Sequence, residues 1–133
     1  RGRRVSAPPG GRVDRAVVAE FFAGHPLGEQ VFDRVWPVLA TWPDSAVRVS
    51  RSQVAFRRRR GLAWLWLPGR YLARPTAEVV LSVALGRRNR SPRWKEVAHP
   101  APAHWIHHLE IRRVAEVDDE VDGWLREAAE RAG

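Results

Sequence analysis

The spacing of the apolar residues changes twice along this chain, and that change constrains the fold more than any other feature of the sequence. Between residues 15 and 40 the apolar side chains recur every three or four positions, which is typical of amphipathic helices. From Ser45 to Ile111 they alternate or form short runs rich in Val, Leu and Trp, which indicates strands. After Asp118 the helical spacing returns. Two helices, a run of strands and a last helix predict an α+β domain.

The two N-terminal helices have recognisable ends. A first helix is expected at about residues 15–23, with the carboxylate of Asp14 accepting the unpaired amides of its first turn. A second is expected at about residues 28–40. Pro37 should kink or tighten this helix, because proline lacks the amide that would bond four residues back.

Five strands are predicted between the helices. The short spacers favour antiparallel hairpins over crossover connections. The expected strands cover residues 47–49, 54–56, 62–67, 78–85 and 105–111. A C-terminal helix follows, capped by Asp118 or Asp119. The predicted architecture is an antiparallel sheet of about five strands, with the two N-terminal helices and the C-terminal helix packed on one face.

The length and the N-terminal composition set the expected domain organisation. The 133 residues fit one domain. Residues 1–12 are basic, rich in Pro and Gly and without period, so we expect a disordered tail followed by a single domain at residues 13–133. There is no signal-peptide pattern, and the longest apolar run, residues 62–68, is too short to span a membrane. A cytoplasmic protein without membrane contact is expected.

Several segments carry a resemblance to a known family: SRSQVAFRRRRGLAWLWLP (50–68), VVLSVAL (79–85), WIHHLEI (105–111), DDEVDGWLREAAE (118–130) and VAEFFAGHPLG (18–28). Through them the chain resembles, over roughly residues 14–132, the uncharacterised bacterial family called domain of unknown function 5655. The resemblance implies a sheet-and-helix domain that occurs alone or joined to other small domains. Because the family has no agreed activity, the resemblance implies no site residues.

The distribution of charge points to an anionic partner. The net charge is +8, with 13 basic residues and one acidic residue between positions 47 and 95, and nine acidic and four basic residues after position 95. Such an asymmetry attracts anions. We expect a surface that binds an anion such as nucleic acid, built from Arg48, Arg51, Arg57, Arg58, Arg59, Arg60, Arg87, Arg88, Arg90 and Arg93. The alternatives are solvated loops, pairing with the acidic C-terminal segment, and the codon bias of a GC-rich genome.

Seven tryptophans in a chain of this length suggest a second kind of site. Trp64 and Trp66 share one face of their strand, while Leu65 and Leu67 share the other. The tryptophan face could stack bases or form the wall of an apolar pocket. The second hypothesis is therefore a small-molecule pocket between sheet and helices. The candidate residues for stacking or for the pocket are Trp64, Trp66, Trp94, Trp105 and His108. Ordinary core packing is the alternative.

Four histidines lie within ten residues, but their spacing does not fit a metal or catalytic site. His107 and His108 are adjacent and point to opposite faces of a strand, and the apolar neighbours of His107 place it on the core side. His108 and Glu110 share the other face, where a His/Glu pair could do acid–base work. There is no nucleophile pattern and no zinc spacing. Without cysteine, disulfides and thiolate ligands are also excluded.

Three functions therefore remain open from the sequence. The leading hypothesis is a non-catalytic binding module for an anionic partner such as nucleic acid. The alternatives are a small-molecule domain with a tryptophan-lined pocket, and a protein-interaction or dimerisation domain that uses a sheet edge or face. An enzyme built on His104, His107, His108 or Glu110 is a weaker fit to the pattern, and no cofactor, metal or catalytic residue is predicted.

Overall fold

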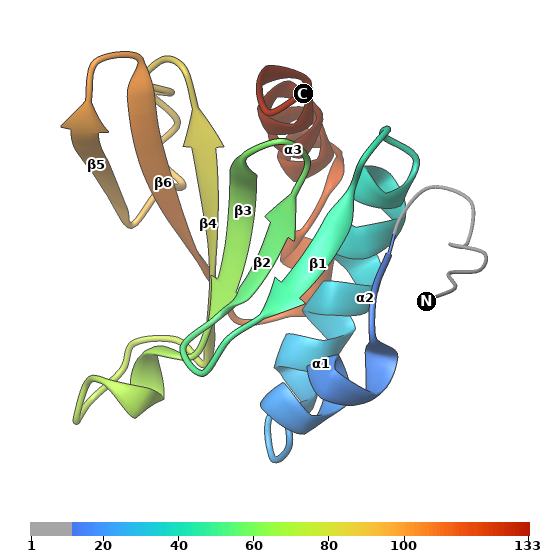
Figure 1. The fold of residues 1–133 in the computed structure, drawn as a ribbon. Helices are drawn as coiled ribbons and strands as arrows, with labels where there is room; N and C mark the ends of the chain where they lie inside the picture. Colours follow the sequence, from blue (N-terminus) through green and yellow to red (C-terminus); the bar gives the residue numbers. More distant parts are fainter. Residues whose placement is uncertain (1–11) are drawn as a thin grey trace.

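The computed structural model describes residues 12–133, so all of the predicted tail except Arg12 lies outside the described residues. Figure 1 shows three helices packed against one strongly twisted sheet. The helices are α1 (Arg15–Phe21), α2 (Pro26–Ala40) and α3 (Asp119–Arg131), with 3-10 turns at η1 (Pro68–Arg70) and η2 (Val114–Glu116). The strands are β1 (Ala46–Val49), β2 (Val54–Arg57), β3 (Gly61–Trp66), β4 (Val79–Leu85), β5 (Glu96–Ala101) and β6 (His104–Ile111).

The helix ends follow from the local sequence. Asp14 caps α1 as predicted, since its carboxylate accepts hydrogen bonds from two amides of the first turn at 3.1 and 3.3 Å. Asp118 caps α3 by accepting from the Val121 amide at 3.1 Å. Helix α2 begins at Pro26, two residues earlier than predicted, because proline at the first helical position loses no intrahelical bond. It then continues through Pro37 to its end as one helix.

The sheet is antiparallel throughout, as predicted, but it has six strands rather than five. The order is β1-β2-β3-β4-β6-β5, so the first four strands form a meander and β6 joins β4 directly. The missed strand is β5, which lies at an edge outside β6. It is mostly exposed, contains Pro100, and its pairing with β6 is irregular between Ala98 and Ala101. An edge strand can hold a proline and needs no apolar alternation, so the sequence carries little sign of it.

The three helices cover one face of the sheet and form the core with it (Figure 1). Five of the fully buried side chains at this interface are Phe32, Phe56, Leu65, Leu81 and Leu125. The other face of the sheet carries no helix among the described residues. The loop at residues 67–78, which contains η1, extends at one end of the sheet away from the helices (Figure 1). This leaves a broad open face on the central strands.

One residue of the N-terminal segment pairs with the outer edge of β1. Arg12 forms an isolated parallel bridge with Ala46, in which the amide of Arg12 donates to Ser45 at 3.2 Å and its carbonyl accepts from Val47 at 2.9 Å. Arg12 therefore belongs to the folded domain. No helix within residues 12–133 has both the length and the apolar character required to cross a bilayer.

Candidate functional site

A broad apolar groove lies on the open face of the sheet. It is a groove of about 720 Å³ with a mostly carbon-lined wall. Its floor comes from β3, β4 and β6, and its rim from the β1–β2 turn and the loop at residues 67–78. The lining residues are Ser52, Gln53, Trp64, Trp66, Tyr71, Leu72, Ser82, Ile106 and His108. A groove of this size and lining is typical of small-molecule sites.

The strand register explains how distant residues meet on this floor. Trp64 on β3 pairs with Ser82 on β4, and Ser82 pairs with His108 on β6. Paired residues of adjacent antiparallel strands point to the same face. One row across the sheet therefore presents an indole, a hydroxyl and an imidazole toward the same groove. Glu96 on β5 continues this row, because it pairs with His108 from the other side.

A hydrogen-bond chain connects the polar atoms of the floor. Nε1 of Trp66 donates to Oγ of Ser82 at 2.9 Å, and that oxygen lies 2.7 Å from Nδ1 of His108. The rings of Trp66 and His108 meet edge to face, with centroids 6.1 Å apart. Burial lowers the pKa of His108 below its ordinary value of 6.5, although the carboxylate of Glu96 acts in the opposite direction. Burial therefore favours the neutral form of His108.

Ser82 is not arranged as a nucleophile, despite its contact with a histidine. Only 3% of Ser82 is exposed, and its oxygen already accepts the hydrogen bond from the indole of Trp66. The serine instead holds two rings of the groove floor in fixed orientations.

The ring of Trp64 lies against Gly61, three residues earlier on the same strand. A Cβ atom built on Gly61 would come within 2.8 Å of the Trp64 ring, so only glycine leaves room for the ring in this position. The indole nitrogen of Trp64 forms no hydrogen bond within residues 12–133. Trp64 therefore presents both a ring and an unused donor beside the groove.

The rim of the groove carries exposed apolar side chains on an anchored loop. Tyr71 and Leu72 are 57% and 55% exposed, and the Tyr71 ring leans on Trp66 with centroids 6.3 Å apart. The base of the loop is held by Arg70, whose guanidinium donates to the carbonyl of Phe21 at 2.8 Å and lies over that residue's ring. The rim thus combines a fixed base with apolar side chains that a ligand could cover.

The structure separates the residues of the predicted pocket. The groove contains Trp64, Trp66 and His108 but lies opposite the helices. Trp94 is buried on the helix side, where its ring packs at a tilt against that of Trp124, with centroids 4.2 Å apart. Trp105 stacks on His99, with centroids 3.4 Å apart, outside the groove. The four tryptophans do not form one pocket, since residue parity places Trp105 on the face opposite His108.

The arginine hairpin between β2 and β3 binds the carbonyl end of α3. The backbone amides of Arg59 and Arg60 both donate to the carbonyl of Ala132, at 3.0 and 3.2 Å. The guanidinium of Arg58 donates to the carbonyls of Ala129 and Pro43 at 2.6 and 2.8 Å. The guanidinium of Arg60 donates to the Arg131 carbonyl at 2.6 Å. Cationic donors at a helix C-terminus satisfy unpaired carbonyls and complement the helix dipole.

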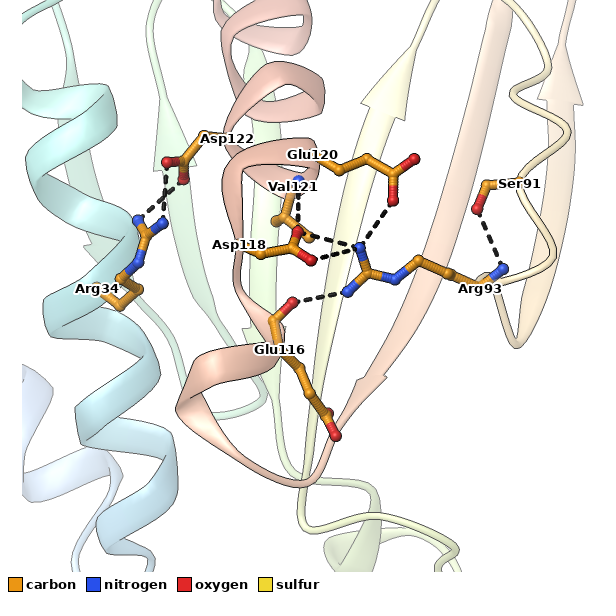
Figure 2. Close-up of polar contacts among 8 residues, drawn as sticks. All are labelled: Arg34, Ser91, Arg93, Glu116, Asp118, Glu120, Val121 and Asp122. Carbon is orange, nitrogen blue, oxygen red and sulfur yellow. Dashed lines mark hydrogen bonds and ion pairs between the residues drawn. The ribbon is translucent and has the colours of Figure 1, made fainter.

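Arg93 binds the other end of α3, as Figure 2 shows. Its guanidinium donates to both carboxylate oxygens of Asp118 at 3.0 and 3.1 Å, to Glu120 at 2.8 Å and to the carbonyl of Glu116 at 2.7 Å. It also lies over the ring of Trp124, 5.7 Å from its centroid. The hydrogen bond to Glu120, followed by that to Asp118, raises the pKa of Arg93 against the opposing effect of burial.

Part of the basic charge therefore pairs with the acidic C-terminal segment, as the sequence allowed. Arg87 adds to this with two 2.8 Å hydrogen bonds to the carboxylate of Glu127. Arg57 makes a long contact of 3.5 Å with the carbonyl of Arg59. The remaining five predicted arginines are exposed, and their guanidinium groups form no hydrogen bond or ion pair within residues 12–133: Arg48, Arg51, Arg59, Arg88 and Arg90.

These five arginines do not lie on one surface. Arg48 and Arg51 lie on β1 and in the β1–β2 turn, at one edge of the sheet. Arg88 and Arg90 precede β5, which is the opposite edge strand. Arg59 lies at the tip of the hairpin beside α3. The structure therefore divides the predicted anion surface into separate places.

The four residues of the enzyme hypothesis are also separated. His107 is fully buried on the helix side, where it accepts from the Asn89 amide at 2.9 Å, and burial lowers its pKa. His104 lies 3.1 Å from the guanidinium of Arg131. Glu110 accepts hydrogen bonds from Thr76 and Arg112. His108 alone of the four lines the groove, and residues 12–133 hold no group of three acidic or histidine side chains suited to a metal ion.

Sequence reasoning found three of the nine groove residues and missed Ser52, Gln53, Tyr71, Leu72, Ser82 and Ile106. One sequence feature could have indicated Ser82, because it is the single polar residue of the run VVLSVAL. The others come from a turn, a loop and a half-buried strand position, where the sequence gives no indication of what lies nearby.

Comparison with known proteins gives a family and no function. Residues 22–131 match a family described as Domain of unknown function (DUF5655), and this match contains every residue that lines the groove. Searches among curated proteins and among solved structures found no match.

Proposed function

This chain belongs to the DUF5655 family, as its sequence predicted, and we propose that it is a non-catalytic domain that binds a small, flat, largely apolar molecule in the groove on the open face of its sheet. The groove itself is the observation that carries this proposal. Its volume, about 720 Å³, falls within the range of small-molecule sites. Trp64 and Trp66 supply broad aromatic surfaces at its floor, and flat molecules bind to such surfaces by stacking.

The arrangement of the polar residues supports binding rather than chemistry. The buried Ser82 accepts a hydrogen bond from Trp66, and among residues 12–133 no carboxylate and no second histidine lines the groove. A few fixed polar groups in an apolar wall orient a ligand and give specificity.

The test is a fragment screen followed by a tryptophan substitution. A library of planar aromatic fragments would be screened by ¹H–¹⁵N chemical-shift perturbation, and we expect shifts at the indole signals of Trp64 and Trp66. Trp64→Ala should raise the Kd of a bound fragment about fivefold, because a lost aromatic contact is worth about 1 kcal/mol. Trp105→Ala is the matched control, since Trp105 stacks on His99 outside the groove, and it should leave the Kd unchanged.

Two results would count against this function. Absence of binding by all planar fragments would overturn it. Binding that Trp64→Ala and Trp105→Ala weaken equally would move the ligand to another site.

A second candidate is the binding of single-stranded nucleic acid across the same face. The specific observation is the position of Arg48, which pairs with Ala55 on β2, while Ala55 pairs with Trp64 on β3. Arg48 therefore points to the same face as the groove, and Arg51 lies in the turn that forms the rim. A base stacked on Trp64 would place its phosphates toward these cations.

Salt dependence separates this candidate from the first. Binding of a short single-stranded oligonucleotide should weaken with salt, with a log–log slope of about −0.7 per phosphate contacted. The variant Arg48→Ser/Arg51→Ser should reduce that slope, while Arg88→Ser/Arg90→Ser, at the opposite edge, should not. An oligonucleotide that fails to bind at about 50 mM salt would leave only the small-molecule function.

A further inference from the structure

We propose that the groove selects flat aromatic molecules that carry a carbonyl group, whose oxygen accepts a hydrogen bond from Nε2 of His108. This inference rests on the proposed function, since it names the class of ligand that the same groove would take. It is carried by the direction of the hydrogen-bond chain beneath the groove.

The direction of that chain is fixed at one end. An indole N–H can only donate, so Oγ of Ser82 accepts from Trp66. The hydroxyl hydrogen of Ser82 then needs an acceptor, and Nδ1 of His108, 2.7 Å away, is the one that residues 12–133 provide. A proton on Nδ1 would leave this hydroxyl hydrogen buried without an acceptor, which is costly. Neutral His108 therefore carries its proton on Nε2.

This N–H reaches the groove. Among residues 12–133, each side-chain nitrogen or oxygen that is fully buried has a hydrogen-bond partner. Nε2 of His108 has none, so it retains accessible surface, and His108 lines the groove. The same argument applies to the indole nitrogen of Trp64. The floor thus offers two donors that the described part of the protein does not use.

The spacing of these donors suits a small planar ligand. Trp64 and His108 lie in one row on β3 and β6, with β4 between them, which separates their backbones by about 10 Å. A bicyclic ring that stacks on Trp64 would bring one substituent to His108. An apolar substituent would leave the N–H of His108 unpaired, while a carbonyl oxygen would satisfy it.

The experiment compares two molecules of matched shape. 2-Acetylnaphthalene offers a carbonyl oxygen, and 2-ethylnaphthalene offers none. We expect the ketone to bind the full chain about three to ten times more tightly, as one added neutral hydrogen bond would produce. Their Kd values would come from ¹H–¹⁵N chemical-shift titrations at pH 7.5. His108→Phe should remove the preference while it retains the binding of 2-ethylnaphthalene.

A control variant and an independent measurement accompany this comparison. His99→Phe makes the same substitution at an exposed position outside the groove and should retain the preference. If His108→Phe does not fold, long-range ¹H–¹⁵N spectra of the unmodified protein test the inference instead, because they show which ring nitrogen of His108 carries the proton. A proton on Nδ1 of His108 at neutral pH would overturn the inference.

The two proposals fail in different ways. Equal binding of the ketone and the hydrocarbon would overturn the selection by His108 and leave the small-molecule function standing. Failure of both naphthalenes to bind would overturn the selection and count against the function as well.

Discussion

Replacing Arg93 with alanine would decide whether the basic loop between β4 and β5 holds the fold together or serves a ligand. The guanidinium of Arg93 contacts two carboxylates and one backbone carbonyl (Figure 2), and it also lies over the ring of Trp124. All of these partners lie on or just before α3. The substitution therefore removes the connection between this loop and the start of that helix.

The magnitude follows from the exposure of each contact. The side chains of Asp118 and Glu120 are 48% and 54% exposed, so each ion pair is worth about 0.5 kcal/mol. The part-buried carbonyl of Glu116 loses its partner at a cost of about 1 kcal/mol. The contact with Trp124 adds about 0.5 kcal/mol. The cap from Asp118 to the Val121 amide remains in place, so the helix still begins at the same residue. We expect a loss of about 2.5 kcal/mol.

Urea denaturation followed by tryptophan fluorescence measures this loss directly. For a domain of this size, about 2.5 kcal/mol corresponds to a fall in Tm of about 9 °C. The matched control is Arg90→Ala, in the same loop, because the Arg90 side chain is exposed and makes no hydrogen bond or ion pair within residues 12–133. It should change stability by less than about 0.5 kcal/mol. The reasoning would be refuted if the two variants were equally stable.

Three further predictions test other parts of the structure. Gly61→Ala should displace the Trp64 ring and weaken ligand binding, while the free energy of unfolding falls by less than about 1 kcal/mol, because the ring can move away from the new methyl group. The ion pair between Arg34 and Asp122 should respond differently to the loss of each partner. Arg34→Met should lower the free energy of unfolding, measured by urea denaturation, by about 2 kcal/mol, and Asp122→Asn by about 1 kcal/mol. The Asp122 side chain is 10% exposed and that of Arg34 is 32% exposed, so water hydrates the carboxylate less well when its partner is removed. Stability should also decline as the pH falls below about 6.5, because burial lowers the pKa values of His107 and His108 and the unfolded chain then binds these protons more tightly. His107→Gln should reduce the slope by at most about 1.4 kcal/mol per pH unit.

Local chemistry made much of the fold predictable from the sequence. The caps at Asp14 and Asp118 depend only on the next few residues; the first was predicted, and the second was one of the two residues predicted to cap the last helix. The alternation of side chains in a strand correctly placed Trp64 and Trp66 on one face, and placed His107 and His108 on opposite faces. These statements need no knowledge of what lies next to each strand.

The rest required knowledge of which elements are neighbours. Parity gives two faces but does not say which one the helices cover, so the sequence could not place Trp64 and Trp66 on the open face. The partners of Arg58 and Arg93 lie 71 and 25 residues away in the sequence, and the basic stretches gave no sign that they would bind the two ends of α3. Strand β5 was missed because an exposed edge strand needs no apolar pattern.

The way these guanidinium groups bind has a consequence for how such a domain can change over evolution. Arg34 forms two parallel hydrogen bonds with one carboxylate, Arg58 joins two carbonyls, and Arg93 joins four oxygen atoms from three residues. Lysine carries the same charge on one tetrahedral nitrogen and cannot reproduce these planar arrangements. Of the 23 lysines and arginines in the chain, 22 are arginine. Drift toward lysine would therefore be tolerated at exposed positions such as Arg88 and opposed at the three that hold α3, whatever the base composition of the genome.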